Sequence, residues 1–105
     1  MAQFTVYRNQ SQRTKSTFPL LVDVQSDLLE ELHTRVVVPL TKSSALTKKP
    51  LGNLTPTIVF DGESYLLMTP QLAGVAKTDL GGPAGSVAEQ RPVIVAAIDF
   101  LLMGF

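Results

Sequence analysis

The segment V-I-V-A-A-I-D-F-L-L-M-G-F occupies residues 93–105, and Asp99 is the only charged side chain within it. Its composition predicts a helix, which at this length spans about 20 Å and is too short for the ~30 Å hydrocarbon core of a bilayer. We therefore expect a helix that packs against protein and does not span a membrane. Because the helix is apolar on nearly every side, the single core of a small domain cannot cover all of its faces. The uncovered face and the apolar end, Met103-Gly104-Phe105, predict an interface with another protein.

Chain length and composition limit the class of protein. A chain of 105 residues with 45% hydrophobic and 17% charged residues is typical of one globular domain, taken as residues 1–105, which dimerisation would help to stabilise. The net charge of zero gives no sign of direct nucleic-acid binding, and the lack of cysteine excludes disulfides and thiolate chemistry. The first residues lack the basic start and apolar middle of a signal peptide, so we expect a cytoplasmic protein.

Basic side chains are concentrated in the first half of the chain. Residues 1–49 contain seven Lys or Arg against four acidic residues, and most of the basic ones lie in two polar segments, residues 8–17 and 41–55. Both segments lack apolar periodicity and are predicted to be loops. This distribution would attract an acidic partner to the first half of the chain, and scattered solubilising charges are the alternative interpretation.

Short strands are predicted along much of the remaining chain. Alternating or β-branched apolar residues mark them at residues 3–7, 18–24, 35–40 and 74–78. The strand at 35–40 is apolar nearly throughout and is expected to be buried on both faces. The glycines and proline of L-G-G-P-A-G, residues 80–85, predict a loop.

The clearest local pattern is a hairpin. Asp61-Gly62 separates the apolar runs at residues 57–60 and 64–68. A type I′ turn needs two residues that tolerate positive φ, and Asp-Gly between apolar runs is the strongest short-range signal for such a turn. The sequence therefore predicts two antiparallel strands joined by a tight turn.

The start of the C-terminal helix has two alternatives. Ser86 and Glu89 form a capping-box pattern, but a helix that begins there places Pro92 beyond its first turn, at a cost of about 3 kcal/mol. A start near Gln90 or Arg91 places Pro92 at the first helical position, where proline is favoured.

A turn is also predicted at residues 25–27, where Asp27 and Glu30 have the spacing of a capping box. One helical turn through Leu28 and Leu29 is expected to follow it. Together the elements predict a mainly β fold, a small and strongly bent sheet or barrel with one C-terminal helix packed on it.

Residues suited to catalysis or metal binding are scarce. His33 is the only histidine and there is no cysteine, so we expect no metal site and no cofactor. Gly81-Gly82-Pro83 lacks the Lys and Ser/Thr that follow in a phosphate-binding loop. One metal-free chemistry remains open, the cleavage of RNA by Arg35 with a nearby carboxylate and the hydroxyl of Thr34.

Four segments of the chain carry a family pattern between them. They are Gln3-Phe4-Thr5-Val6-Tyr7, V-D-V-Q-S-D-L-L at residues 22–29, R-V-V-V-P-L at residues 35–40, and A-I-D-F-L-L-M-G-F at residues 97–105. In this order they resemble CcdB, the toxin family of CcdA/CcdB toxin–antitoxin modules, over essentially the whole chain. The most specific piece is V-D-V-Q-S-D. The resemblance implies a homodimer of SH3-like barrels, each with a C-terminal helix.

The resemblance also implies a function without catalysis. CcdB toxins bind the A subunit of DNA gyrase and trap the gyrase–DNA cleavage complex, and a CcdA-type antitoxin neutralises them, in modules of plasmid maintenance or of the chromosome. The family's gyrase contacts map onto Leu28, Leu29, Asp99, Met103, Gly104 and Phe105. Its antitoxin contacts map onto two loops with the basic residues Arg8, Arg13, Lys15, Lys42, Lys48 and Lys49.

The chain departs from the family pattern in two places. The family's best-known members end in Trp-Gly-Ile where this chain has Met103-Gly104-Phe105, and they have Asn on the helix where it has Asp99. The loss of Trp removes a large aromatic contact, which the adaptable Met103 side chain and Phe105 replace in part. We therefore expect gyrase poisoning that is weaker or directed at a different gyrase.

Other interpretations remain open at this point. The 35–40 strand also resembles that of MazF/Kid-type toxins, which share the fold and cleave mRNA without a metal, although the start of the chain lacks their opening motif. A CcdB relative without toxicity is a further alternative. Judged without the resemblance, Leu28 and Leu29 would be core residues, and Met103 and Phe105 would pack in a dimer interface.

Overall fold

The computed structural model describes residues 2–43 and 52–104 of the chain. Within these ranges lie seven strands, one α-helix and several single turns of 3-10 helix. The strands are β1 (Thr5–Asn9), β2 (Leu20–Asp23), β3 (Thr34–Lys42), β4 (Thr57–Phe60), β5 (Glu63–Leu67), β6 (Ala73–Ala76) and β7 (Leu80–Ser86). The 3-10 turns are η1 (Asp27–Leu29), η3 (Thr69–Gln71), η4 (Lys77–Asp79) and η5 (Ala88–Gln90), and the helix is α1 (Arg91–Met103).

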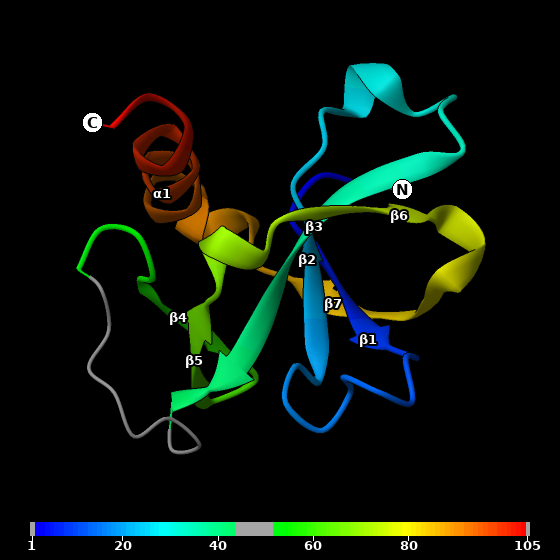
Figure 1. Cartoon of the computed structure of the whole chain (residues 1–105), viewed down its shortest axis with the longest axis horizontal. Helices are drawn as coiled ribbons and strands as arrows, with labels where there is room; N and C mark the ends of the chain where they lie inside the picture. The colour runs from blue at the N-terminus through cyan, green and yellow to red at the C-terminus, as the bar shows by residue number, and fades with distance from the viewer. Residues whose placement is uncertain (1, 44–51, 105) are drawn as a thin grey trace.

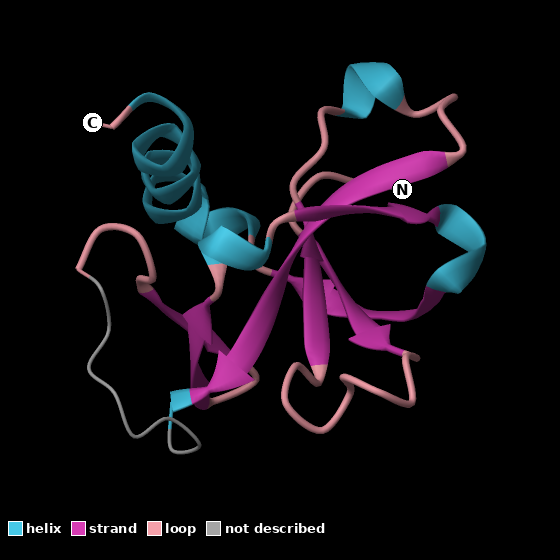
Figure 2. Ribbon diagram, in the orientation of Figure 1, coloured by secondary structure: helices cyan, strands magenta, loops and turns pink. Residues whose placement is uncertain are grey.

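All described strands belong to one antiparallel sheet, in the order β4-β5-β3-β2-β1-β7. The long strand β3 pairs twice on the same side, with β6 along its first half and with β5 at its end. Because β3 is shared in this way, the sheet curls into a half-open barrel (Figure 1). Figure 2 shows α1 at one edge of the curled sheet, which confirms the predicted mainly β fold with one C-terminal helix.

The core fills the inside of the curled sheet. Side chains from five strands and from α1 meet there, among them Val6, Val22, Val38, Leu40, Ile58, Leu67, Ile94 and Ala97. Ile94 and Ala97 lie three residues apart on α1 and point to the same side of the helix. Burial of a side chain such as Ile94 contributes about 1.5–3 kcal/mol, which is what holds α1 against the sheet.

The predicted hairpin is confirmed. β4 and β5 pair antiparallel, with Val59 opposite Ser64 and Phe60 opposite Glu63. The two turn residues have positive φ, 51° at Asp61 and 77° at Gly62. These are the conformations that a type I′ turn requires.

The helix begins at Arg91, so the second of the two predicted starts is the observed one. Pro92 lies in the first turn, where its missing N–H costs nothing. The helix ends at Met103, because Gly104 adopts a left-handed conformation with φ of 83° and donates its N–H to the carbonyl of Phe100. It therefore runs from 91 to 103 rather than from 93 to 105.

The loop predicted at residues 80–85 is wrong, because this segment is strand β7, paired with β1. Glycine permits the pairing: a Cβ on Gly81 would lie 2.8 Å from the carbonyl oxygen of Arg8. Pro83 is tolerated because β7 is an edge strand with β1 as its partner, and two register shifts absorb the irregular spacing. Tertiary pairing has overridden a composition that is typical of loops.

Other predicted boundaries move by a few residues. The strands predicted at 3–7, 18–24 and 74–78 are observed as β1, β2 and β6. The strand predicted at 35–40 is longer, since β3 includes Thr41 and Lys42, whose polar surroundings are typical of a loop. Its buried residues, such as Val37, Val38 and Leu40, confirm the predicted burial. The rest of the predicted 41–55 loop lies partly outside the described residues.

Candidate functional site

Large apolar side chains are exposed in two main places on the described surface. The first, which we call the leucine tip, consists of Leu28, Leu29 and Leu32 in the connection between β2 and β3. The second, the helix face, consists of Val93, Phe100, Leu101, Leu102 and Met103 on α1. Exposed apolar groups of this kind mark surfaces that bind other proteins. They are the strongest functional feature of the described part of the chain.

Leu28 and Leu29 of the leucine tip lie in the single 3-10 turn η1, which projects beyond the sheet (Figure 1). Ser26 precedes the turn, and its Oγ accepts a hydrogen bond from the N–H of Leu28 at 3.1 Å. The predicted cap is corrected here: Ser26 caps the turn, while Oδ1 of Asp27 accepts from the N–H of Gln3 at 2.7 Å. The Leu28 side chain is 94% exposed, which rules out its assignment to the core.

Gln25 lies beneath the tip and is buried. Its side-chain Oε1 accepts from the N–H of Val36 at 3.1 Å, and its Nε2 donates to the carbonyl of Leu29 at 3.2 Å. One side chain thus connects strand β3 to the turn that carries the exposed leucines.

A buried ion pair lies next to Gln25. The guanidinium of Arg35 donates from Nε to Oδ2 of Asp23 at 2.8 Å and from Nη2 to Oδ1 at 3.0 Å, and both side chains are fully buried. Two further bonds reach the backbone of Gln25: Asp23 Oδ1 accepts its N–H at 3.0 Å, and Arg35 Nη2 donates to its carbonyl at 3.2 Å. The remaining nitrogen of Arg35, Nη1, is buried without a hydrogen-bond partner among the described residues.

The burial of Arg35 bears on the ribonuclease alternative. That interpretation needs a cation in contact with RNA, but this guanidinium is shielded from solvent and held by the Asp23 carboxylate. Thr34 is exposed on the same strand, so the two predicted residues do not face a common site. Arg35 is a structural residue, and the ribonuclease alternative loses the group on which it depended.

Tyr7 is close enough to this pair to respond to it. Burial raises the pKa of the Tyr7 hydroxyl above its ordinary value, and the negative charge of Asp23 raises it further. The positive charge of Arg35 acts in the opposite direction. The pair and Tyr7 therefore form one electrostatically connected group behind the leucine tip.

The helix face comprises the large apolar side chains of α1 that the core leaves exposed; four of them are consecutive, residues 100–103, and so surround the last turn of the helix. Ile94 and Ala97 are buried against the sheet, whereas Leu102 and Met103 are 68% and 66% exposed. Asp99 is exposed as well and is the only charge between Arg91 and the end of the described helix. The predicted surplus apolar face is thus observed. Phe105 lies outside the described residues.

The structure does not merge the two apolar groups into one patch within a single chain. Figure 1 shows α1 and the η1 turn well apart along the same edge of the molecule. Leu28 and Leu29 therefore come from one element, and Asp99, Met103 and Gly104 from another. A partner that contacts both groups must span this edge.

Four of the predicted basic residues, Arg8, Arg13, Lys15 and Lys42, lie on elements at the other end of the sheet. Arg8 and Lys15 line one hollow of about 480 Å³, together with Gly81 and Gly82. The 10–19 loop is held to β3 by the Thr41 hydroxyl, which donates to the carbonyl of Thr17 at 2.8 Å. This contact brings the loop next to the end of β3.

The other predicted basic residues are distributed as follows. Arg13 is exposed on the 10–19 loop. Lys42 is exposed at the end of β3, where its Nζ lies 3.7 Å from Oε2 of Glu63. Lys48 and Lys49 lie outside the described residues. The structure thus brings Arg8, Lys15 and Lys42 to neighbouring elements.

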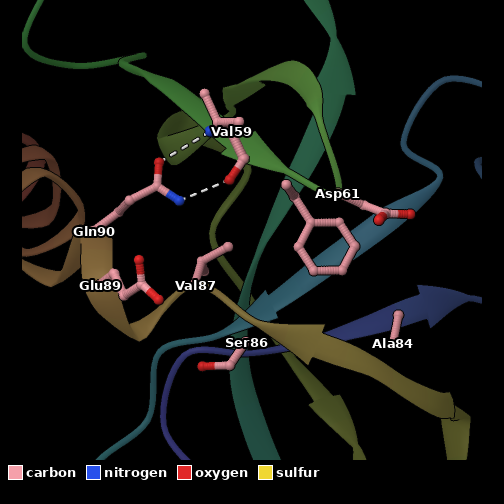
Figure 3. Close-up of a pocket in the computed structure, with 8 residues that line it drawn as sticks. Val59, Asp61, Ala84, Ser86, Val87, Glu89 and Gln90 are labelled. Atoms are coloured by element: carbon pink, nitrogen blue, oxygen red, sulfur yellow. Dashed lines mark hydrogen bonds between the residues drawn. The ribbon is translucent and has the colours of Figure 1, made fainter.

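A pocket of about 300 Å³ lies between β4 and the start of α1 (Figure 3). Its main feature is Gln90, whose side chain points at the backbone of Val59 and bonds to it twice. Gln90 Oε1 accepts the N–H at 2.9 Å and Nε2 donates to the carbonyl at 2.7 Å. The amide thereby occupies the free edge of β4, as a neighbouring strand would. The Gln90 side chain thus covers the edge of the sheet at β4, and the residues that line the pocket form no recognisable catalytic site.

Sequence reasoning missed three residues that matter here. Leu32 completes the leucine tip, and its spacing of four residues from Leu28 was the available signal. Gln25 and Gln90 bond to backbone groups 11 and 31 residues away, and the turn and helix-start patterns in which they lie do not predict these distant bonds. Residues 2–43 and 52–104 contain no group of His, Asp and Glu that could hold a metal ion. No helix in these ranges is long and apolar enough to cross a membrane.

Comparison with known protein families gives a match over nearly the whole chain. The family model described as CcdB protein matches residues 3–104. This range includes the leucine tip, the buried Asp23–Arg35 pair and the whole of α1.

Proposed function

The chain belongs to the CcdB family of toxins from toxin–antitoxin systems, and from this premise we propose that it poisons DNA gyrase by binding its A subunit. In this proposal the protein is not an enzyme. It acts by protein–protein contact, holding the gyrase–DNA cleavage complex so that the cut DNA is not resealed.

One observation carries the proposal: the described residues that correspond to the family's gyrase contacts, Leu28, Leu29, Asp99, Met103 and Gly104, are exposed in this chain. Leu28 is almost wholly exposed, and Met103 is two-thirds exposed. Leaving such side chains in water forgoes about 1.5–3 kcal/mol each, which burial against a partner would recover. Asp99 adds a charge at the middle of the helix face, where it would orient the contact.

The proposed active form is a homodimer. A single chain exposes five large apolar side chains on α1, more than the target contact at its end requires. We propose that the exposed apolar side chains of α1 that precede Met103 pack in the dimer, while Met103, Gly104 and Phe105 contact the target. Two copies would then present two apolar helix ends to the two halves of the gyrase A dimer.

Neutralisation is proposed to occur at the basic end of the sheet. A CcdA-type antitoxin with an acidic, disordered segment would bind Arg8, Arg13, Lys15 and Lys42, together with Lys48 and Lys49. Opposite charges would speed the encounter, and folding on binding would make it reversible. The hollow lined by Arg8 and Lys15 lies away from the leucine tip, so this contact and the gyrase contact involve different elements.

The test is a cleavage assay with purified protein, gyrase, plasmid and ATP. We expect linear DNA to accumulate after denaturation of gyrase, and a chain lacking residues 103–105 to yield none while remaining a folded dimer. Val59→Thr removes an exposed apolar side chain on β4, which belongs neither to the leucine tip nor to α1, and serves as the control that keeps full activity. No cleavage complex at saturating protein would overturn the proposal.

A further inference from the structure

We infer that Gln25 is a positioning residue that fixes the leucine tip to the buried Asp23–Arg35 pair, so that target affinity depends on a glutamine buried beneath the contact surface. The inference rests on the proposed function for its readout of affinity. Its structural part, that Gln25 determines the conformation of the tip, can be tested without any target.

The tip has almost no apolar support of its own. Residues 24–33 separate β2 from β3, and none of the three residues of η1 is buried. A segment without buried apolar contacts keeps a single conformation only through its hydrogen bonds. The tip therefore depends on the polar groups that reach it from elsewhere in the fold.

Apart from the bonds to the capping Ser26, three hydrogen bonds between described residues reach residues 27–32 from outside, and they differ in burial. The N–H of Gln3 donates to Asp27, and Lys77 donates from Nζ to the carbonyl of Glu30; both contacts are exposed. The third comes from the buried Gln25, and its hydrogen bond to Leu29 is partly buried. Hydrogen bonds shielded from water are stronger and cost more to lose than exposed ones. Among the three, the Gln25 contact should thus contribute most to order at Leu29.

The backbone N–H and carbonyl of Gln25 are each held by a hydrogen bond. Asp23 accepts its N–H, and Arg35 donates to its carbonyl. Because the carboxylate and guanidinium also bind each other through two hydrogen bonds, neither can turn away freely. The side chain of Gln25 then has both ends engaged, Oε1 on Val36 and Nε2 on Leu29.

This arrangement orders the tip before any partner arrives. Ordering a loop on binding lowers affinity, and a surface already held in its bound form avoids that cost. The same geometry accounts for a charged pair in the interior of a small domain, where apolar residues would fill the space as well. In this inference the pair is retained because it orients Gln25.

Two variants separate the roles of the glutamine amide. Gln25→Met keeps the length of the side chain and removes both hydrogen bonds. Gln25→Glu keeps an acceptor for the N–H of Val36 but removes the donor to Leu29. Gln12→Met, an exposed glutamine on the 10–19 loop, is the matched control.

The first readout is amide hydrogen exchange followed residue by residue. With Gln25→Met we expect the amides of Leu29 and Leu32 to exchange about five- to tenfold faster, as for the loss of one buried hydrogen bond, while strand amides such as Val22 and Val38 are unchanged. Gln25→Glu should give the same loss at the tip with the Val36 amide still protected. Unchanged exchange at the tip overturns the inference, as does a uniform increase over all amides, since that would be a general loss of stability.

The second readout is affinity for the gyrase A subunit. Gln25→Met is expected to weaken binding about tenfold and Gln12→Met to leave it unchanged. If the tip becomes mobile while affinity stays at the wild-type value, positioning of the contact by Gln25 is overturned and the proposed function stands. If the unmodified protein does not bind gyrase, the proposed function fails, and the exchange experiment still decides whether Gln25 orders the tip.

Discussion

Nε of Arg35 lies 2.8 Å from Oδ2 of Asp23, and neither side chain has any surface exposed to solvent. Removing one partner leaves the other charge buried and uncompensated, which costs about 3–5 kcal/mol. We therefore predict that Asp23→Leu and Arg35→Met each lower the free energy of unfolding by roughly that amount. The double variant Asp23→Leu/Arg35→Met should lose less than either single one, because no bare charge remains.

Urea unfolding of the four proteins at one fixed protein concentration measures these differences, since the proposed dimerisation would make apparent stability concentration-dependent. A double variant whose loss equals the sum of the two single losses would show that the charges do not interact.

Local chemistry is what made parts of this fold predictable. Asp61-Gly62 specifies its turn because few other residue pairs tolerate positive φ twice in succession, and Pro92 restricts where a helix can begin. The exposed apolar helix face was predicted because a helix that is apolar on nearly every side has more apolar surface than the core of a small domain can cover. In each case the residues that determine the structural feature lie close together in the sequence.

The features that the sequence did not reveal depend on contacts between distant segments. β7 is a strand because it pairs with β1. The sequence of this segment is typical of a loop and does not reveal that Gly81 allows the two backbones to approach closely. From the sequence alone, Leu28 and Leu29 could belong to the core or to the surface. The structure shows that the turn, capped by Ser26 and bonded to Gln25, leaves both side chains exposed. The buried pairing of Asp23 with Arg35 likewise needs the register of β2 against β3.

The hairpin turn gives a second prediction. Gly62 has φ of 77°, which an L-residue with a Cβ adopts at a cost of about 1 kcal/mol, so Gly62→Ala should destabilise the protein by that amount. Gly74 is the matched control, since a Cβ there meets no atom within 4 Å and its φ is not in the left-handed region. Thermal unfolding should show a lower Tm for Gly62→Ala and no decrease in Tm for Gly74→Ala. Equal Tm values for the two variants would contradict the assigned turn.

A third prediction concerns the edge of β4. Gln90 supplies both a donor and an acceptor to Val59, so Gln90→Ala should cost about 1 kcal/mol and leave the edge of the strand open. An open edge pairs readily with another chain, so light scattering on mild heating should rise as well. Glu89→Ala, at the exposed neighbouring position, is expected to change neither property. If Gln90→Ala scatters light no more than the wild type, the edge-covering role is wrong.

Alkaline pH supplies a fourth prediction. The pKa of Tyr7 is raised above its ordinary value of about 10 by burial and by the Asp23 charge, and that of Tyr65 by burial, by its hydrogen bond to Glu63 and by nearby acidic charges. Below pH 10 both hydroxyls are neutral in the folded and unfolded chains. As pH rises beyond 10 the unfolded chain loses these protons first, so stability must fall. Urea unfolding from pH 8 to 11 should show this fall, and Tyr7→Phe should reduce its slope.

The last prediction concerns Met103, the position at which the family resemblance leads us to expect Trp. Met103 is two-thirds exposed, so Met103→Trp should alter the free energy of unfolding by less than about 0.5 kcal/mol. If this residue contacts gyrase, the larger and more rigid aromatic side chain should lower the concentration needed for half-maximal DNA cleavage by about tenfold, because Trp is the side chain most enriched among residues that dominate binding energy. Val59→Trp adds the same group to an exposed position on β4 and should have no such effect. A gain shared by both variants would mean that added hydrophobicity, rather than a contact at the end of α1, drives the binding.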